Sequence, residues 1–158
     1  MLIAAKVEDR SIWLWRTLFD NWNCYTRGLP FVARKGLGQP HWFNEVSAVR
    51  HRDALLAMHG RSVAADEAIQ GRHEVTLNVD HVTPVNVIRD MIIEQAAEWT
   101  EIDQLEAFLQ TWYKLCVLTP AEHERLNSKA FHRNRLPADR LFDRYALAGI
   151  PLVGHNGT

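Results

Sequence analysis

The spacing of apolar side chains predicts that the first part of this chain is mostly helical. Residues 11–26 place apolar side chains at helical spacing, with Ser11 in the N-cap position. The next stretch, 27–43, contains three glycines and two prolines and is typical of a long loop. Residues 44–59 return to helical spacing. A polar connector is expected after them, in which 66–70 forms a helical turn.

The period of the pattern then changes. Over 73–80 apolar and polar side chains alternate, which predicts a half-buried strand that Pro84 ends or bends. Helical spacing returns over 86–98. The range 100–110 predicts another helix, with Thr100 as its N-cap and an acidic residue at the reciprocal position.

The last third of the chain begins with a short apolar run, 113–118, which has strand character. Thr119-Pro120-Ala121-Glu122 is a capping box with proline at the first helical position, so a helix is expected from Pro120 to about Phe131. Residues 138–147 predict a last short helix, and the tail from Gly149 is expected to be loose. Together these elements predict an α+β fold that is mostly helical.

The composition fits one globular domain, but the charge is unevenly distributed. The chain has 158 residues, of which 47% are hydrophobic and 23% are charged, and its net charge is −1. Lys and Arg outnumber acids by seven to two over 10–52 and by seven to four over 114–144, whereas 53–113 holds three Arg and eleven acids. Two basic segments that fold onto one surface would suit a nucleic-acid backbone. Ordinary solvated helices with uneven charge are the alternative.

Cysteine use and hydropathy indicate the cytoplasm. The two cysteines, Cys24 and Cys116, are too few for a disulfide scaffold or a four-cysteine zinc site, and neither stands in a CxxC pair. No apolar run reaches the roughly 18 residues of a membrane span, and the first ten residues lack the apolar segment of a signal peptide. We therefore expect a reducing cytoplasm and no membrane association.

Two short segments combine residue types that can bind a metal and move a proton. Asp80 and His81 stand at the end of the predicted strand, where adjacent side chains diverge. His123 and Asn127 are four apart on the predicted helix and share one face. Asp, His and the Asn carbonyl can ligate a divalent cation, and a neutral His can act as a general base. This set suits phosphodiester hydrolysis with one metal.

A less specific interpretation of these residues stays open at this point. Asp80 and His81 would then be a polar strand end with a surface histidine, and His123 would be an exposed helix histidine beside two glutamates. Asn127 late in a short helix would be an ordinary terminator.

Three segments carry a more specific pattern. They are Val79-Asp80-His81-Val82-Thr83-Pro84-Val85, Leu115-Cys116-Val117-Leu118-Thr119, and the helix with His123. In this order they resemble the HNH, or ββα-metal, endonucleases of phage and bacterial type. Some phage-type members also carry a Trp and an aromatic- and leucine-rich helix between the two strands, to which 99–109 is similar.

The resemblance covers about 73–131 and implies a domain plan. The core would be a small antiparallel β-hairpin packed on a metal-binding helix, the ββα-metal motif, with a helical insertion at 86–110. The helical region 1–72 would belong to the same domain, and 132–158 would be a C-terminal extension.

The resemblance also implies a role for each matching residue. His81 would be the general base, and Asp80 and His123 would hold a divalent cation, Mg²⁺ or Mn²⁺, with Ni²⁺ or Zn²⁺ as alternatives. Asn127 stands where some members have a further metal ligand. The substrate would be DNA, nicked or cut to 5′-phosphate and 3′-hydroxyl ends in a bacterial host or a phage-infected cell.

Phosphate contacts are expected from the basic segments, and the acidic insertion is expected to face away from the DNA. The residues proposed for these contacts are Arg34, Lys35, Arg125, Lys129, Arg133 and Arg135. Nothing in the pattern indicates an oligomeric state.

The chain departs from the family pattern before the second strand. Members usually have an Asn there that orients the base through its carbonyl, and this chain has Gln110 or Thr111 at that place. Gln110 or a backbone carbonyl would have to substitute, or catalysis would be weak or absent. The CxxC knuckles of many relatives are also missing, so no structural zinc is expected.

The missing Asn and the acidic segment 53–113 favour a second hypothesis. The chain would then be a non-catalytic HNH-like protein, either a DNA-binding accessory factor or a phage-encoded inhibitor of a host protein. An acidic surface can imitate DNA or bind a basic protein.

Overall fold

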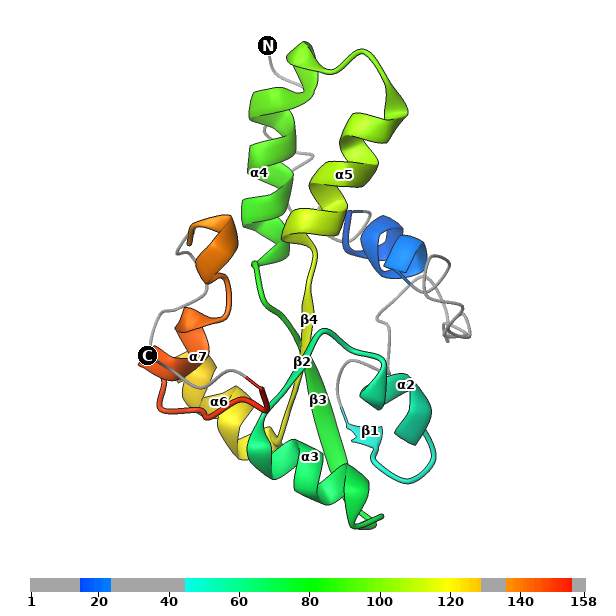
Figure 1. Cartoon of the computed structure of the whole chain (residues 1–158), viewed down its shortest axis with the longest axis vertical. Coiled ribbons are helices and arrows are strands. Elements are labelled where there is room, and N and C mark those ends of the chain that lie inside the picture. Colours follow the sequence, from blue (N-terminus) through cyan, green and yellow to red (C-terminus); the bar gives the residue numbers. More distant parts are fainter. Residues whose placement is uncertain (1–14, 24–44, 129–135, 155–158) are drawn as a thin grey trace, which may run out of the picture.

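The computed structural model describes residues 15–23, 45–128 and 136–154. In these residues the protein is a mixed α and β structure in which helices predominate, as the sequence predicts. A small central sheet has the strand order β1-β3-β4-β2 (Figure 1). Its strands are β1 Val46–Ser47, β2 Gly60–Arg61, β3 Thr76–His81 and β4 Leu115–Leu118.

Helices cover this sheet, and residues 15–23 form the first of them. The labelled helices are α2 Arg52–Leu56, α3 Val63–Gln70, α4 Val85–Gln95, α5 Ile102–Trp112, α6 Pro120–Ser128 and α7 Asp143–Leu147. Two short 3-10 helices, Ala96–Glu98 and Ala138–Arg140, follow α4 and precede α7.

β3 and β4 form the centre of the sheet and pair antiparallel. The predicted alternation in β3 is confirmed, because Leu77 and Val79 are buried while Asn78 and Asp80 are only partly covered. β1 adds antiparallel to β3, and β2 adds parallel to β4. The sheet is therefore larger than the two-stranded hairpin that the resemblance implied.

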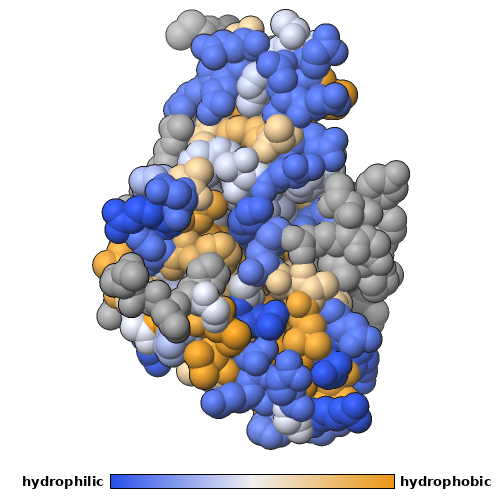
Figure 2. Space-filling view, viewed as in Figure 1, coloured by the Kyte–Doolittle hydropathy of each residue, from blue (hydrophilic) through white to orange (hydrophobic). Residues whose placement is uncertain are grey.

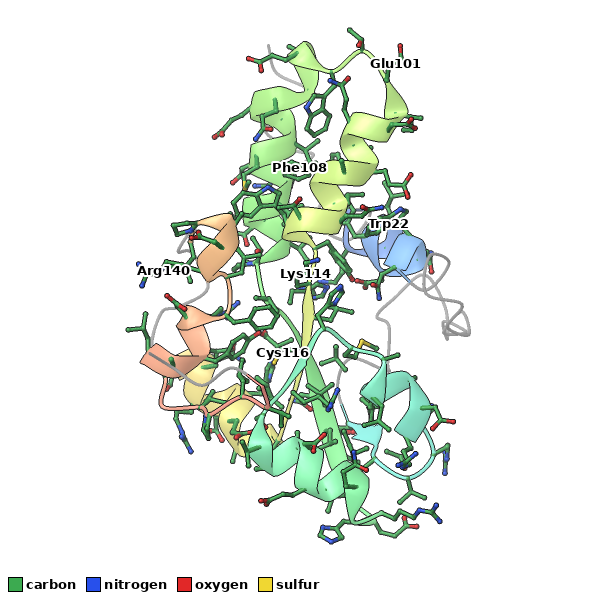
Figure 3. All side chains as sticks on the ribbon, in the orientation of Figure 1. Trp22, Glu101, Phe108, Lys114, Cys116 and Arg140 are labelled. Atoms are coloured by element: carbon green, nitrogen blue, oxygen red, sulfur yellow. The ribbon has the colours of Figure 1, made fainter. Side chains whose placement is uncertain are left out.

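Two apolar clusters lie on the two faces of the sheet. One contains side chains from helix 15–23 and α2 to α5, and the other contains side chains from α6, α7 and the C-terminal segment. β4 contributes to both, because Leu115 and Val117 belong to the first cluster while Cys116 and Leu118 belong to the second. Cys116 thus lies at the centre of the molecule (Figure 3).

The start of α6 follows the predicted capping box. The Thr119 backbone N–H donates to Glu122 Oε2 at 2.9 Å, and the Glu122 N–H donates to Thr119 Oγ1 at 3.3 Å. Glu122 is buried and also accepts a hydrogen bond of 2.6 Å from Ser62 Oγ, the N-cap of α3. The helix is therefore held at its first turn to another part of the fold.

The helix predicted over 44–59 is wrong. Glu45 has a φ of +58°, and Val46 and Ser47 pair with Leu77 and Thr76 as strand β1. Only the five residues of α2 remain helical in this range. Pairing with the edge of β3 satisfies backbone groups that a helix would otherwise satisfy, and sequence periodicity does not reveal such a distant partner.

The connector after residue 60 is more regular than predicted, although the helical turn expected at 66–70 is present, and the described part of the C-terminal tail, 149–154, is not loose as predicted. The connector contains β2 and the eight residues of α3, whose N-cap Ser62 accepts from the Ala65 N–H at 3.1 Å. The tail packs against it, because Leu152 is buried and bridges to Ser62. The Val153 N–H donates to the Arg61 carbonyl at 2.9 Å, so backbone pairing holds the tail in place.

The insertion between β3 and β4 forms two helices that lie side by side and extend to one end of the molecule (Figure 1). Phe108 of α5 packs against Trp99, with ring centroids 5.3 Å apart (Figure 3). The N-cap of α5 is Glu101, in a capping box with Gln104, and not Thr100 as predicted. Hydrophilic residues dominate this end of the surface (Figure 2). Among the described helices, none is both long and apolar enough to cross a membrane.

Candidate functional site

The two candidate residues at the end of β3 face opposite sides of the sheet. Asp80 is opposite Cys116 in the register and its carboxylate meets side chains of α6 and α7. His81 is opposite Leu115 and its ring meets helix 15–23. This divergence follows from the period of two of an extended strand.

Asp80 lies among three side chains from α6 and α7. Tyr145 donates its hydroxyl to Asp80 Oδ2 at 2.7 Å, and Arg144 Nη1 lies 3.6 Å from the same oxygen. The other oxygen, Oδ1, lies 3.9 Å from His123 Nε2. The structure therefore brings together Asp80 and His123, two of the three predicted metal ligands.

The His123 ring is held from its other nitrogen. Asn78 Nδ2 lies 3.0 Å from His123 Nδ1, and Asn127 Nδ2 lies 3.4 Å from it. Asn78 shares a face of β3 with Asp80 because the two are separated by one residue. These contacts leave Nε2 as the nitrogen that faces Asp80. Sequence reasoning missed Asn78, although its position two before Asp80 was a usable signal.

The distance between Asp80 and His123 is short enough for both side chains to bind the same cation. Oxygen and nitrogen ligands bind at about 2.0–2.2 Å, so two ligands of one ion lie within roughly 4.4 Å of each other. A ring that ligates through Nε2 must carry its proton on Nδ1, and turning the Asn78 amide by half a turn would present its oxygen there. In the described part of the chain, no group of three His, Cys, Asp or Glu side chains is placed to hold a metal ion. The pair therefore suits an ion such as Mg²⁺, which keeps water or phosphate in its other positions.

Asn127 does not point into the space between Asp80 and His123. It contacts the other nitrogen of the His123 ring and lies on the exposed side of α6. Its role as a metal ligand stays a prediction, and it would require a different side-chain rotamer.

His81 is not a surface histidine, because only 11% of its side chain is exposed. Its Nε2 lies 3.1 Å from Asp20 Oδ1, and Tyr113 donates its hydroxyl to the same oxygen. The Tyr113 oxygen lies 3.4 Å from His81 Nε2, and the two rings meet edge to face. Two buried residues, Asp20 and Tyr113, and the partly buried His81 thus form one hydrogen-bonded group.

Asp20 was not predicted because it looks like part of a polar face. Within helix 15–23, however, Asp20 and Asn23 are buried beside Phe19, while Leu18 is 53% exposed. Helical periodicity assigns Leu18 to the core and Asp20 to solvent, so it gives the wrong face here. Only the approach of β3 and Tyr113 explains why a carboxylate is buried at this place.

Gln110 does not take the place of the missing Asn. Its side chain is exposed on α5 and its amide donates to Glu106 Oε1 at 3.4 Å. The acceptor at His81 Nε2 is Asp20, from a helix that precedes β3 by more than 50 residues.

Arg144 ties the C-terminal segment to the end of β3. Its Nη1 donates to the carbonyls of His81 and Val82, at 2.8 Å each, and its side chain is buried. These carbonyls belong to the last residue of β3 and to the residue after it, where the guanidinium supplies hydrogen-bond donors at the end of the strand. Arg144 and Tyr145, which lie in the predicted C-terminal extension, therefore contribute to the site.

Two other titratable groups are buried beside Asp80. Burial raises the pKa of the Cys116 thiol, and the negative charge of Asp80 raises it further. Burial, and then the charge of Asp80, also raises the pKa of Tyr145 well above its usual value. Cys116 is thus a poor nucleophile, and Tyr145 stays a hydrogen-bond donor.

Of the residues predicted to contact phosphate, the structure describes Arg125. It is exposed on α6 one turn from the capping box, and its Nη1 donates to the Gly149 carbonyl at 3.2 Å. The others lie outside the described residues: Arg34, Lys35, Lys129, Arg133 and Arg135.

Comparison with known proteins does not indicate a function for this chain, so the function is argued from the geometry of the site. No protein-family model, curated sequence or solved structure matches this chain.

Proposed function

We propose that this chain is a metal-dependent DNA endonuclease or nickase of the HNH type, with His81 as the general base. The ββα-metal motif would consist of β3, β4 and α6. The observation that carries the proposal is the pair Asp80 Oδ1 and His123 Nε2, 3.9 Å apart, in which Asp80 directly precedes His81 in the chain.

The arrangement of the three elements supports this assignment. β3 and β4 are antiparallel, and α6 follows β4 after one residue and packs on the face of β3 that carries Asn78 and Asp80. The candidate base His81 and one candidate metal ligand, Asp80, are therefore adjacent at the end of β3, and the other ligand, His123, reaches Asp80 from α6. The proposal requires a phosphate that bridges this end of β3, because the Asp80 and His81 side chains leave the strand on opposite faces.

In this proposal Asp80 and His123 hold the cation, with Asn127 as a further candidate ligand. A cation held there would act as a Lewis acid toward the charge on the phosphate and on the leaving 3′ oxygen. His81 accepts the proton of the attacking water. Tyr145 holds Asp80 through Oδ2, which leaves Oδ1 directed at His123. Arg125 and the other predicted basic residues would contact the DNA backbone.

Cleavage of supercoiled plasmid in Mg²⁺ or Mn²⁺ tests the proposal. We expect nicked or linear product with the wild-type protein and at least about a hundredfold less with His81→Ala or His123→Ala. His73→Ala removes an exposed histidine outside the site and should cleave like wild type. The variants, purified in the same way and shown to be folded by circular dichroism, control for a contaminating nuclease.

The enzyme hypothesis fails if the wild-type protein cleaves nothing or if His81→Ala cleaves equally well. One observation favours the non-catalytic alternative, an accessory factor or an inhibitor of a host protein. Asp80 Oδ2 already has Tyr145 and Arg144 as partners, so the carboxylate is satisfied without a metal. Calorimetric titration with Mn²⁺ separates the two, because the alternative predicts no binding that depends on Asp80 and His123.

A further inference from the structure

The ring of His81 is supported by a residue far from it in the sequence. Asp20 belongs to helix 15–23 and its Oδ1 lies 3.1 Å from His81 Nε2. Only 3% of Asp20 is exposed, and its Oδ2 has no hydrogen-bond partner among the described residues. A buried carboxylate is costly, so its retention beside a candidate general base calls for an explanation.

Tyr113 determines where the carboxylate lies. Its hydroxyl donates to Asp20 Oδ1, and its buried ring packs against Phe19 and Trp22 of the same helix, with centroids 5.9 and 6.3 Å away. Tyr113 also directly precedes the Lys114-to-Leu118 segment that contains β4. Asp20 is therefore fixed from its own helix and from the sheet.

The chemistry of this group selects one form of the ring. An ionised carboxylate only accepts hydrogen bonds, so the nitrogen that faces it must carry a proton. In a neutral ring this is the Nε2–H tautomer, which assigns the proton-accepting role to Nδ1. A carboxylate at this place also stabilises the imidazolium formed when the ring accepts a proton.

We infer that Asp20 is the positioning residue of His81, held in place by Tyr113, and that it performs the orienting role for which the chain lacks an Asn before β4. This inference rests on the proposed function for its catalytic meaning. It makes helix 15–23 a required part of the active site. A segment limited to 73–131 would lack the carboxylate that orients the general base His81.

The test uses the full chain and two measurements. The first is the tautomer of His81, read at one fixed pH from the ¹⁵N shifts of its ring nitrogens. The second is plasmid cleavage. Asp20→Asn offers a donor as well as an acceptor, and Tyr113→Phe removes only the hydroxyl and keeps the ring in the core. Asp66→Asn is the matched control, because Asp66 is a partly buried carboxylate paired with Arg61 in another part of the fold.

We expect the Nε2–H tautomer in the wild-type protein and in Asp66→Asn, and a changed tautomer population in Asp20→Asn. We also expect kcat to fall about 10- to 100-fold in Asp20→Asn with KM unchanged, as for other groups that orient a functional side chain. Tyr113→Phe should lower kcat by up to about tenfold, since it loses one hydrogen bond.

The results separate this inference from the proposed function. If the wild-type protein cleaves and Asp20→Asn cleaves equally well, the inference is overturned and the nuclease assignment stands. If no protein cleaves, the nuclease assignment fails and the tautomer alone decides whether Asp20 orients His81. An Nδ1–H tautomer in the wild-type protein, or a tautomer population that is unchanged in folded Asp20→Asn, overturns the inference in either case.

Discussion

Asp80 and His81 are consecutive in β3 but belong to two separate hydrogen-bonded groups. Asp80 joins His123, Asn78 and Tyr145 on one face of the sheet, and His81 joins Asp20 and Tyr113 on the other. Each group can therefore be altered without removing a direct contact of the other.

This separation predicts which residues bind metal. In Mn²⁺ titration calorimetry, Asp80→Asn and His123→Ala should each weaken binding at least about tenfold, because each removes one of two protein ligands. His81→Ala should bind like wild type, because its ring faces Asp20. An equal loss of affinity in His81→Ala would instead place His81 among the metal ligands.

The two amides beside His123 can be ranked in the same experiment. Asn78 is the nearer to Nδ1, at 3.0 Å against 3.4 Å for Asn127. If both only orient the ring, Asn78→Ala should weaken Mn²⁺ binding by about tenfold and Asn127→Ala by less. The reverse order would show that Asn127 turns inward to ligate the ion, as the resemblance implies.

Arg144 should contribute more to stability than its neighbour Arg140. Arg144→Met removes two hydrogen bonds to the carbonyls at the end of β3, and we expect the free energy of unfolding to fall by about 2–4 kcal/mol. Arg140 is 67% exposed and pairs with Asp143, so Arg140→Met should change it by about 0.5 kcal/mol or less. Urea denaturation of the two variants measures the free energy of unfolding. Equal losses in the two variants would mean that the buried hydrogen bonds of Arg144 add no more stability than the exposed ion pair of Arg140.

Cys116 should react only when the protein unfolds. Because burial and Asp80 raise the pKa of its thiol, the reactive thiolate is scarce below the raised pKa and becomes common only at more alkaline pH. We expect iodoacetamide at pH 8 to leave Cys116 unmodified in the native protein and to alkylate it fully in urea. Peptide mass spectrometry reads Cys116 separately from Cys24. Rapid native alkylation at Cys116 would contradict its buried position.

Local signals in the sequence predicted the centre of the fold. The alternation before Asp80 defines β3, the apolar run before Thr119 defines β4, and the capping box starts α6 at Pro120. These features depend on residues close together in the chain, so pattern and capping chemistry suffice to predict them. Asp80 and His123 were recognised for the same reason, since each stands at a fixed offset from such an element.

The parts that sequence analysis missed depend on distant partners. β1 replaced a predicted helix because the edge of β3 was there to pair with it, and in the described part of the tail Val153 pairs with Arg61. Asp20 and Arg144 look like ordinary charged residues of amphipathic segments. Their burial has a cause only once His81 and the end of β3 lie against them.

The sequence by itself thus determined the elements around the site and the residue types that could carry chemistry. Only the tertiary structure decided that Asp80 and His81 contact different segments of the chain. Asp80 contacts side chains of the C-terminal segment, and His81 contacts Asp20 of the N-terminal segment. The physical reason is that a buried polar group must find a hydrogen-bond partner. That partner is selected by proximity in space, which periodicity along the chain does not encode.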